Sequence, residues 1–308
     1  MIDKKNFYIN GEWTSSTEPR IYKVIDPSNE EPCAEICLGG KKDVDKAVSA
    51  AKKAFETWAF SKKEERLDLL EKLYVVYKKR WAEMAKLISL EMGAPMKFST
   101  EMQAATGASH IKSFKNILKD FKFEKDLGEE KNNQKLLYEP KGVCALITPW
   151  NWPINQVNLK VIPALASACT VVLKPSEIAP LSSMLLAEMI DEVKFPPGVF
   201  NLINGDGAVT GDALTSHPDI NMISFTGSTR AGALISQNAA KDFKRISLEL
   251  GGKGANIIFK DADSEAVARG VLRCFRNSGQ SCNAPTRMLV EKSIYNETVE
   301  KVKELANN

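Results

Sequence analysis

One cysteine differs from the other five in its surroundings, and a thiol in such a place could act as a nucleophile. Cys282 lies in the polar segment Ser278-Gly279-Gln280-Ser281-Cys282, off any apolar stripe. A nucleophilic thiol needs partial access and donors that stabilise its thiolate. Cys282 is therefore a candidate nucleophile, and a passive loop thiol is the alternative. Most of the other cysteines lie in apolar runs, where a thiol is a small buried hydrophobe: Cys33, Cys37, Cys144, Cys169 and Cys274.

A second candidate is a glutamate flanked by apolar residues at the end of a predicted strand. Glu249 lies between Leu248 and Leu250 and is followed by Gly251 and Gly252. A carboxylate in apolar surroundings suits the role of a general base. The alternative is an ordinary surface charge at the end of a strand.

Two glycine-containing segments each follow a predicted strand and open a predicted helix, which is the context for phosphate binding by backbone N–H groups. The first, residues 205–211, has the spacing GxGxxxG, one residue longer than the usual dinucleotide fingerprint. The second is Phe225-Thr226-Gly227-Ser228-Thr229. A glycine turn or a helix N-cap without any ligand explains either segment equally well.

Other site chemistries find little support in the sequence. It holds only two histidines, His110 and His217, and no HExxH motif, while Cys33 and Cys37 lack further ligands nearby. No GxSxG elbow occurs, and the Gly-Lys pair before Gly254 lacks the Ser or Thr of a phosphate-binding loop. We therefore expect no metal site, no serine hydrolase and no P-loop nucleotidase.

The elements that must position these residues alternate between strand and helix after Pro140. Such alternation predicts parallel strands joined by crossover helices, hence an α/β, doubly wound, mainly parallel sheet. The predicted strands are 143–147, 170–173, 199–203, 222–225, 245–248 and 255–259, and a helix is predicted over 264–277.

The first 140 residues combine a hairpin with several helices. The Asn10-Gly11 pair lies between aromatic and β-branched residues, which is typical of a two-residue hairpin turn. Helices are predicted from Asp43, from a capping box that starts at Ser61, up to Gly93, and over 98–121. The polar, lysine-rich stretch 122–140 predicts an exposed pair of strands.

Composition limits the class of protein further. The chain has 308 residues, 44% of them hydrophobic, and a net charge of +3 with both signs interleaved, so nucleic acid is not an expected partner. No signal peptide is evident, and the most apolar stretch, 161–173, is too short to span a bilayer. Sparse cysteines fit a reducing compartment, so we expect a soluble, cytoplasmic protein.

Five segments, in order along the chain, resemble motifs of the aldehyde dehydrogenase superfamily. They are Pro149-Trp150-Asn151-Trp152-Pro153, Lys174-Pro175-Ser176-Glu177, Phe225-Thr226-Gly227-Ser228, Glu249-Leu250-Gly251-Gly252-Lys253 and Gly279-Gln280-Ser281-Cys282. The resemblance runs from Tyr8 to the end of the chain. It implies a Rossmann-like cofactor domain, a small bridging β arm and a second α/β catalytic domain.

The resemblance also implies a mechanism for the matching residues. Cys282 would attack an aldehyde, and the Asn151 amide with the Cys282 backbone N–H would hold the resulting oxyanion. Hydride would pass to NAD, and water deprotonated by Glu249 would release the carboxylate. Lys160 would help to order this network, although a helix-surface lysine is the alternative.

For the cofactor, the resemblance implies that Lys174 and Glu177 hydrogen-bond the adenosine ribose. A carboxylate there would repel a 2′-phosphate, so NAD is expected in preference to NADP. The full set of expected cofactor contacts is Trp150, Lys174, Ser176, Glu177, Gly207, Gly211, Phe225, Thr226, Gly227, Ser228 and Gly251.

By the family's layout, residues 1–118 and 140–248 would form the NAD-binding domain, 119–139 the bridging and oligomerisation arm, and 249–308 the start of the catalytic domain. The chain stops after about two-thirds of the family's length, so that last portion is expected to be incomplete and to expose apolar surface. A homo-oligomer is expected for a full-length parent. The rival hypothesis is a truncated, catalytically silent product that at most binds NAD, and the sequence does not identify the aldehyde.

Overall fold

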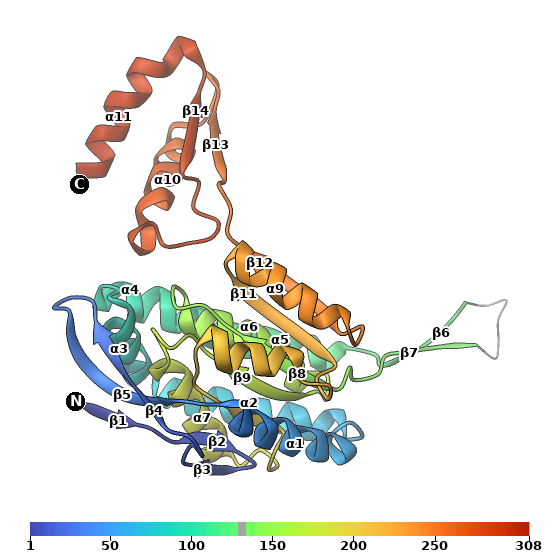
Figure 1. Cartoon of the computed structure of the whole chain (residues 1–308). Helices are drawn as coiled ribbons and strands as arrows, with labels where there is room; N and C mark the ends of the chain where they lie inside the picture. The colour runs from blue at the N-terminus through green and yellow to red at the C-terminus, as the bar shows by residue number, and fades with distance from the viewer. Residues whose placement is uncertain (129–133, 308) are drawn as a thin grey trace. The chain divides into compact units, whose positions relative to one another are not determined.

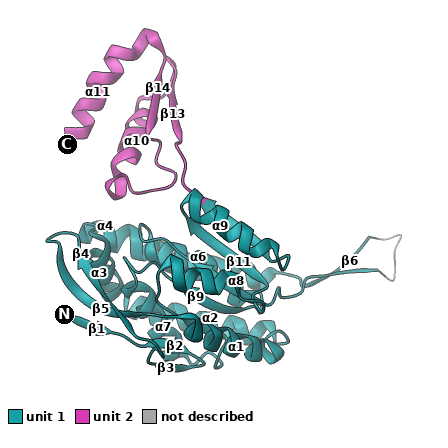
Figure 2. Cartoon of the chain, viewed as in Figure 1, with its two compact units in different colours: residues 1–249 teal, residues 250–308 magenta. Residues whose placement is uncertain are grey.

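The computed structural model describes residues 1–128 and 134–307. It divides into two compact units, unit 1 (Met1–Glu249) and unit 2 (Leu250–Asn308), which Figure 2 colours separately. Each unit is described by itself. None of the helices over the described residues is long and apolar enough to cross a membrane.

Unit 1 is built on a seven-stranded sheet with the strand order β12-β11-β8-β9-β10-β2-β3 (Figure 1). The four central strands pair in parallel, and the N-terminal hairpin adds to β10 in antiparallel fashion. The prediction of a doubly wound, mainly parallel sheet is thus confirmed. The strands are β2 (Phe7–Ile9), β3 (Glu12–Thr14), β8 (Val143–Ile147), β9 (Thr170–Lys174), β10 (Phe200–Leu202), β11 (Met222–Gly227) and β12 (Arg245–Leu250).

Helices cover both faces of this sheet. Cys144 on β8 and Val171 on β9 belong to the core that these strands share with α6 (Pro153–Ala166) and α7 (Leu181–Val193). The residues that alternate with them along each strand point to the opposite face. On that face α1 (Lys41–Trp58) packs against β8, β9 and β10, and α9 (Thr229–Ala240) packs against β11. The remaining helices of unit 1 are α2 (Lys63–Lys79), α3 (Trp81–Met92), α4 (Met96–Phe98), α5 (Ala104–Asp120) and α8 (Asp212–Ser216).

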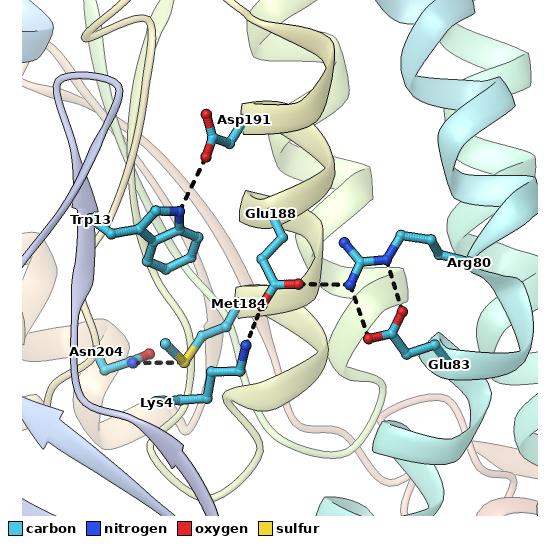
Figure 3. Close-up of polar contacts among 8 residues, drawn as sticks. All are labelled: Lys4, Trp13, Arg80, Glu83, Met184, Glu188, Asp191 and Asn204. Atoms are coloured by element: carbon cyan, nitrogen blue, oxygen red, sulfur yellow. Dashed lines mark hydrogen bonds and ion pairs between the residues drawn. The ribbon is translucent and has the colours of Figure 1, made fainter.

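A second sheet of three strands was not predicted from the sequence. It has the order β1-β5-β4, from β1 (Ile2–Lys4), β4 (Arg20–Asp26) and β5 (Glu31–Leu38). Figure 3 shows how polar contacts tie the N-terminal strands to α7: Glu188 pairs with Lys4 and, at 2.7 Å, with Arg80. Next to them the Trp13 indole N–H donates to Asp191 at 3.2 Å.

Two local predictions in the helical region were wrong. The capping box at Ser61 does not form, because α2 begins one residue later with Lys62 as N-cap and the Ser61 hydroxyl accepts from Arg66 at 3.0 Å instead. The predicted helix over 98–121 is interrupted by the π-helical turn Ser99–Gln103 before α5 begins. By contrast, Gly93 ends α3 in the left-handed conformation, as predicted.

The predicted exposed strand pair is present as β6 (Glu124–Asp126) and β7 (Lys135–Leu137), which pair in antiparallel register. All six residues are exposed. The predicted arm 119–139 also includes residues 129–133, which lie outside the described residues.

Unit 2 is a small α/β unit with two parallel strands, β13 (Ala255–Ile258) and β14 (Arg287–Val290). Helices α10 (Ser264–Phe275) and α11 (Tyr295–Asn307) pack against each other. On α10 only Val271 is buried, so the apolar face that the sequence predicts for this helix is largely uncovered. The expected exposed apolar surface is present, with these side chains more than a third exposed: Ile257, Phe259, Leu272, Phe275, Leu289 and Tyr295.

Candidate active site and cofactor cleft

A cleft of 560 Å³ opens where β8, β9 and β11 end in unit 1. In open α/β sheets the carboxyl ends of the strands are where ligands bind. Four of the residues that the sequence assigned to the cofactor line this cleft: Lys174, Gly207, Gly211 and Phe225. These four of the eleven predicted cofactor contacts therefore lie together in the fold, while the other seven do not line the cleft.

Lys174 ends β9 with its side chain almost completely buried. Its ammonium donates to the carbonyl of Pro175 at 3.1 Å and to that of Gly205, and it lies 3.6 Å from the Glu177 carboxylate. Burial lowers the pKa of Lys174, while Glu177 and Asp206 act in the opposite direction. The amine is thus fixed at the wall of the cleft with a carboxylate beside it, which suits the recognition of adjacent hydroxyl groups.

The extra residue of the GxGxxxG segment is accommodated by its local helical structure. Residues Gly207–Gly211 form a π-helical turn, which closes over one residue more than an α-helical turn. Asp206 caps the turn by accepting from the Val209 N–H at 2.7 Å, and its other oxygen pairs with Arg20 at 2.6 Å. Gly207 is exposed to the cleft, with open space where a side chain would begin.

The second glycine segment forms the N-terminus of α9. The Ser228 hydroxyl accepts from the Ala231 N–H at 3.2 Å, so Ser228 is the N-cap, and it is exposed. Thr226 is buried, and its hydroxyl has no hydrogen-bond partner among the described residues. A side chain at Gly227 would meet the ring of Phe225, so only glycine leaves this ring against the cleft.

The segment bearing Asn151 connects β8 to α6. Trp150, Asn151 and Trp152 are half-buried, and the Asn151 carbonyl accepts from the Gln103 amide at 3.3 Å. Trp152 also stacks edge-on against Phe98, with ring centres 5.7 Å apart. The tail of α4 and the π-helical turn therefore hold this segment against the end of the sheet.

Lys160 is buried inside unit 1, so the alternative of a helix-surface lysine is wrong. It is 7% exposed, and its ammonium donates to the Ser224 hydroxyl at 3.2 Å. Burial lowers the pKa of Lys160 to about 8, and the charge of Glu249 acts in the opposite direction. Lys160 and Glu249 are therefore close enough to interact, although the Glu249 side chain is exposed at the end of β12.

Cys282 lies in unit 2, in an exposed loop that folds back on the glycines after Glu249. A side-chain carbon added at Gly252 would lie 3.7 Å from the Cys282 carbonyl. Just before this loop, Asn277 and Ser278 have φ angles of 55° and 56°, and Gly279 has 71°. Left-handed non-glycine residues are strained and are often found at functional sites.

The structure leaves other predicted residues outside the cleft lining. Ser176 accepts from the Ile178 N–H at 3.3 Å, and Gly251 is exposed in unit 2. The sequence analysis missed the residues of α9 that line the cleft. Helical periodicity could have placed them on one face: Arg230, Ala231, Leu234, Ile235 and Asn238. Within residues 1–128 and 134–307 no group of three or more His, Cys, Asp and Glu residues could hold a metal ion.

A family model described as the aldehyde dehydrogenase family matches residues 13–308. The chain belongs to this family. It is 51% identical over 295 residues to a 3-succinoylsemialdehyde-pyridine dehydrogenase of a Pseudomonas species, covering 95% of this chain and 61% of that protein.

Solved structures of aldehyde dehydrogenases share the fold closely. The enzyme from Bartonella henselae superposes with a TM-score of 0.98 at 58% identity, covering 100% of this chain and 64% of that one. Aldehyde dehydrogenase C of Pseudomonas syringae, as a mutant complexed with NAD+ and octanal, gives 0.96 at 44% identity, covering 99% and 62%. The chain thus spans a little over three-fifths of the length of these relatives.

Proposed function

We propose that this chain carries the cofactor site and the principal catalytic residues of an NAD-dependent enzyme that oxidises an aldehyde to a carboxylate. The observation that carries the proposal is the cleft in unit 1, where Lys174, Gly207, Gly211 and Phe225 meet at the ends of the parallel strands. Residues 1–118 and 140–248 form the cofactor domain in this proposal, and residues 249–308 belong to the catalytic domain.

The residues around the cleft fit a dinucleotide. The fixed Lys174 amine and the Glu177 carboxylate offer a donor and an acceptor for the two hydroxyls of a ribose. The N-terminus of α9 offers backbone N–H groups and the positive end of a helix dipole to a pyrophosphate. Because Glu177 would repel a 2′-phosphate, NAD is favoured over NADP.

Cys282 is the proposed nucleophile. Its exposed thiol, once ionised, adds to the carbonyl carbon of the aldehyde, so that a C–S bond forms and the carbonyl oxygen becomes an oxyanion. The Asn151 amide and the Cys282 backbone N–H supply the donors for this oxyanion. When held in the cleft, NAD would supply the hydride acceptor for oxidation of this adduct to the thioester.

Glu249 and Lys160 act on the second half of the reaction in this proposal. Glu249 takes a proton from the water that attacks the thioester, which releases the carboxylate and regenerates the thiol. The buried Lys160 ammonium attracts the Glu249 carboxylate and so restrains its position. The aldehyde itself is not specified by these residues, and a homo-oligomer is proposed for a longer parent.

The test is NADH production from a broad panel of aldehydes. The proposal predicts steady production that is lost in Cys282→Ala, while NAD binding measured by calorimetry is retained. Cys274→Ala, which removes a thiol from the same unit, serves as the matched control and keeps activity. NAD binding without turnover of any aldehyde would instead support a catalytically silent product, a reading favoured by the location of the whole cleft within unit 1.

A further inference from the structure

Two cysteines outside the proposed active site come together where β8 and β9 begin. These strands are parallel neighbours, with Cys144 of β8 opposite Val171 of β9. Cys169 directly precedes β9, two positions before the residue opposite Cys144. Cys144 is 2% exposed and Cys169 is 4% exposed. The Cys144 thiol lies 3.8 Å from the Gly142 carbonyl as a donor, and it is also close enough to the Cys169 sulfur for the two groups to shift each other's pKa.

The Cys169 sulfur is surrounded by donors. The Lys141 backbone N–H donates to it at 3.2 Å, the Ser167 hydroxyl lies 3.6 Å away, and the Gly142 N–H also contributes. Such donors favour a thiolate over a thiol. The interaction with Cys144, followed by these donors, lowers the pKa of Cys169 to about 6, against the opposing effect of burial.

Charged groups from several elements also face this sulfur. The guanidinium of Arg66, on α2, interacts electrostatically with Cys169. Lys141 and Glu139, before β8, and Lys160, on α6, line the same cavity as the two cysteines. Three positive groups and a single carboxylate are therefore found around the two thiols.

The cavity gives small molecules room beside the two thiols. Its volume is 330 Å³, at the lower end of the range for small-molecule sites. Cys144, Cys169 and Ser167 contribute to its lining, with Pro163 and Ala164 of α6. A compact reagent fits such a space, whereas a bulky one does not.

We propose that Cys169 is a second reactive thiol of this chain, distinct from Cys282, and a modification site for small hydroperoxides. The thiolate sulfur attacks one peroxide oxygen, so that an S–O bond forms and the O–O bond breaks. Sulfur is oxidised to a sulfenic acid, and the other peroxide oxygen leaves as hydroxide from hydrogen peroxide or as an alkoxide from an organic hydroperoxide, which then takes a proton from solvent. Cys144 is a positioning residue that donates to the thiolate.

The first test is the rate of alkylation by iodoacetamide, followed for each cysteine peptide of the 308-residue chain by mass spectrometry across pH 5 to 9. Cys33 is the internal control, because it is more exposed than Cys169 and burial with nearby carboxylates raises its pKa. We expect labelling of Cys169 to reach half its maximal rate near pH 6 and to stay constant above pH 7. A rate that still rises between pH 7 and 9, as for Cys33, would overturn the proposal.

Variants of Cys144 separate a positioning role from mere packing. Cys144→Ser keeps a donor and should leave the pH midpoint at Cys169 unchanged, whereas Cys144→Ala should raise it. Circular dichroism checks that both variants fold. An equal midpoint in the two variants would remove Cys144 from the site.

The oxidation step is tested with hydrogen peroxide and dimedone, which traps sulfenic acids. We expect a dimedone adduct on the Cys169 peptide in the parent chain and in Cys282→Ala, and its loss in Cys169→Ser. An adduct confined to Cys282 would refute oxidation at Cys169. Neither result depends on aldehyde turnover, so this proposal can fail while the proposed function stands, and the reverse is also possible.

Discussion

Replacing Lys160 by methionine should stabilise unit 1 at neutral pH. The folded protein holds this ammonium at a cost, since burial lowers its pKa from 10.5 to about 8. That difference corresponds to roughly 3 kcal/mol at about 1.4 kcal/mol per pH unit. Loss of the hydrogen bond to Ser224 destabilises the variant by about 1 kcal/mol. The net effect is that Lys160→Met should have a free energy of unfolding about 2 kcal/mol higher than the parent chain at pH 7.

The pH dependence gives the sign of the same effect. Because the pKa of Lys160 is lower in the folded chain, the unfolded chain binds more protons between about pH 8 and 10.5, and stability rises over that window. Below pH 8 the full cost is present and constant. Lys160→Met should therefore lose this rise relative to the parent chain.

Urea unfolding followed by tryptophan fluorescence measures this effect in unit 1 alone, because all five tryptophans lie before residue 249. Lys112→Met, an exposed change on α5, serves as the matched control and should leave both the stability and its pH dependence unchanged. A Lys160→Met variant that is less stable at pH 7, or that keeps the rise above pH 8, would refute a desolvated charge at this position.

Three further predictions follow from single contacts. Glu91 is buried and accepts hydrogen bonds from the Leu181 and Ser182 N–H groups, and burial raises its pKa to about 7. The folded chain therefore binds more protons than the unfolded chain between about pH 4.5 and 7, so stability falls as pH rises across that window. Glu91→Gln should abolish the fall in urea titrations at pH 5 and 7, and an unchanged slope would contradict this. Ser228→Ala should lower the free energy of unfolding by about 1 kcal/mol, because the helix loses its N-cap. Ser228→Asp keeps the cap and should weaken NAD binding, measured by calorimetry, by charge repulsion. Equal NAD affinity of Ser228→Asp and the parent chain would show that Ser228 is not at the phosphate site. Gly205→Ala should lower the free energy of unfolding, measured by thermal unfolding, by about 1–3 kcal/mol, because its new methyl group meets Thr210. Gly207→Ala places its methyl group in open space and should change this free energy by no more than about 0.5 kcal/mol. Equal effects of the two variants would contradict this difference in packing.

Local signals in the sequence predicted those parts of the fold that short-range physics decides. The Asn10-Gly11 turn is an example, since both residues adopt positive φ angles of 56° and 79° as a two-residue hairpin requires. The capping box at Ser61 failed because the side chain of Arg66, five residues further along in α2, takes the same hydroxyl as its acceptor. The three-stranded sheet was missed because Ile21 and Ile25 lie on the exposed face of β4, so the sequence shows no alternation of apolar and polar residues there.

The candidate site divides in the same way. Gly207, Gly211 and Phe225 could be predicted because each belongs to a glycine-containing segment that follows a predicted strand, and the parallel sheet gathers such positions at one edge. Lys174 was predicted only because its segment resembles a family motif. The wall that α9 contributes was missed, because its residues look like an ordinary amphipathic face until the helix is placed beside the cleft.

The environment of Cys169 could not be predicted from the sequence at all. Both it and Cys144 lie in apolar runs, which indicate only small buried side chains. They meet because β8 and β9 are neighbours in the sheet, and the order of strands is a property of the whole topology.

In the proposed mechanism, Cys282 carries the acyl group and Glu249 activates the water that removes it. The most direct measurement uses Glu249→Gln with aldehyde and NAD, combining rapid NADH detection with mass spectrometry of the Cys282 peptide. We expect a burst of one NADH per active chain, then slow turnover, with an acyl adduct on Cys282. Full steady turnover in Glu249→Gln, or an acyl adduct on another residue, would contradict it.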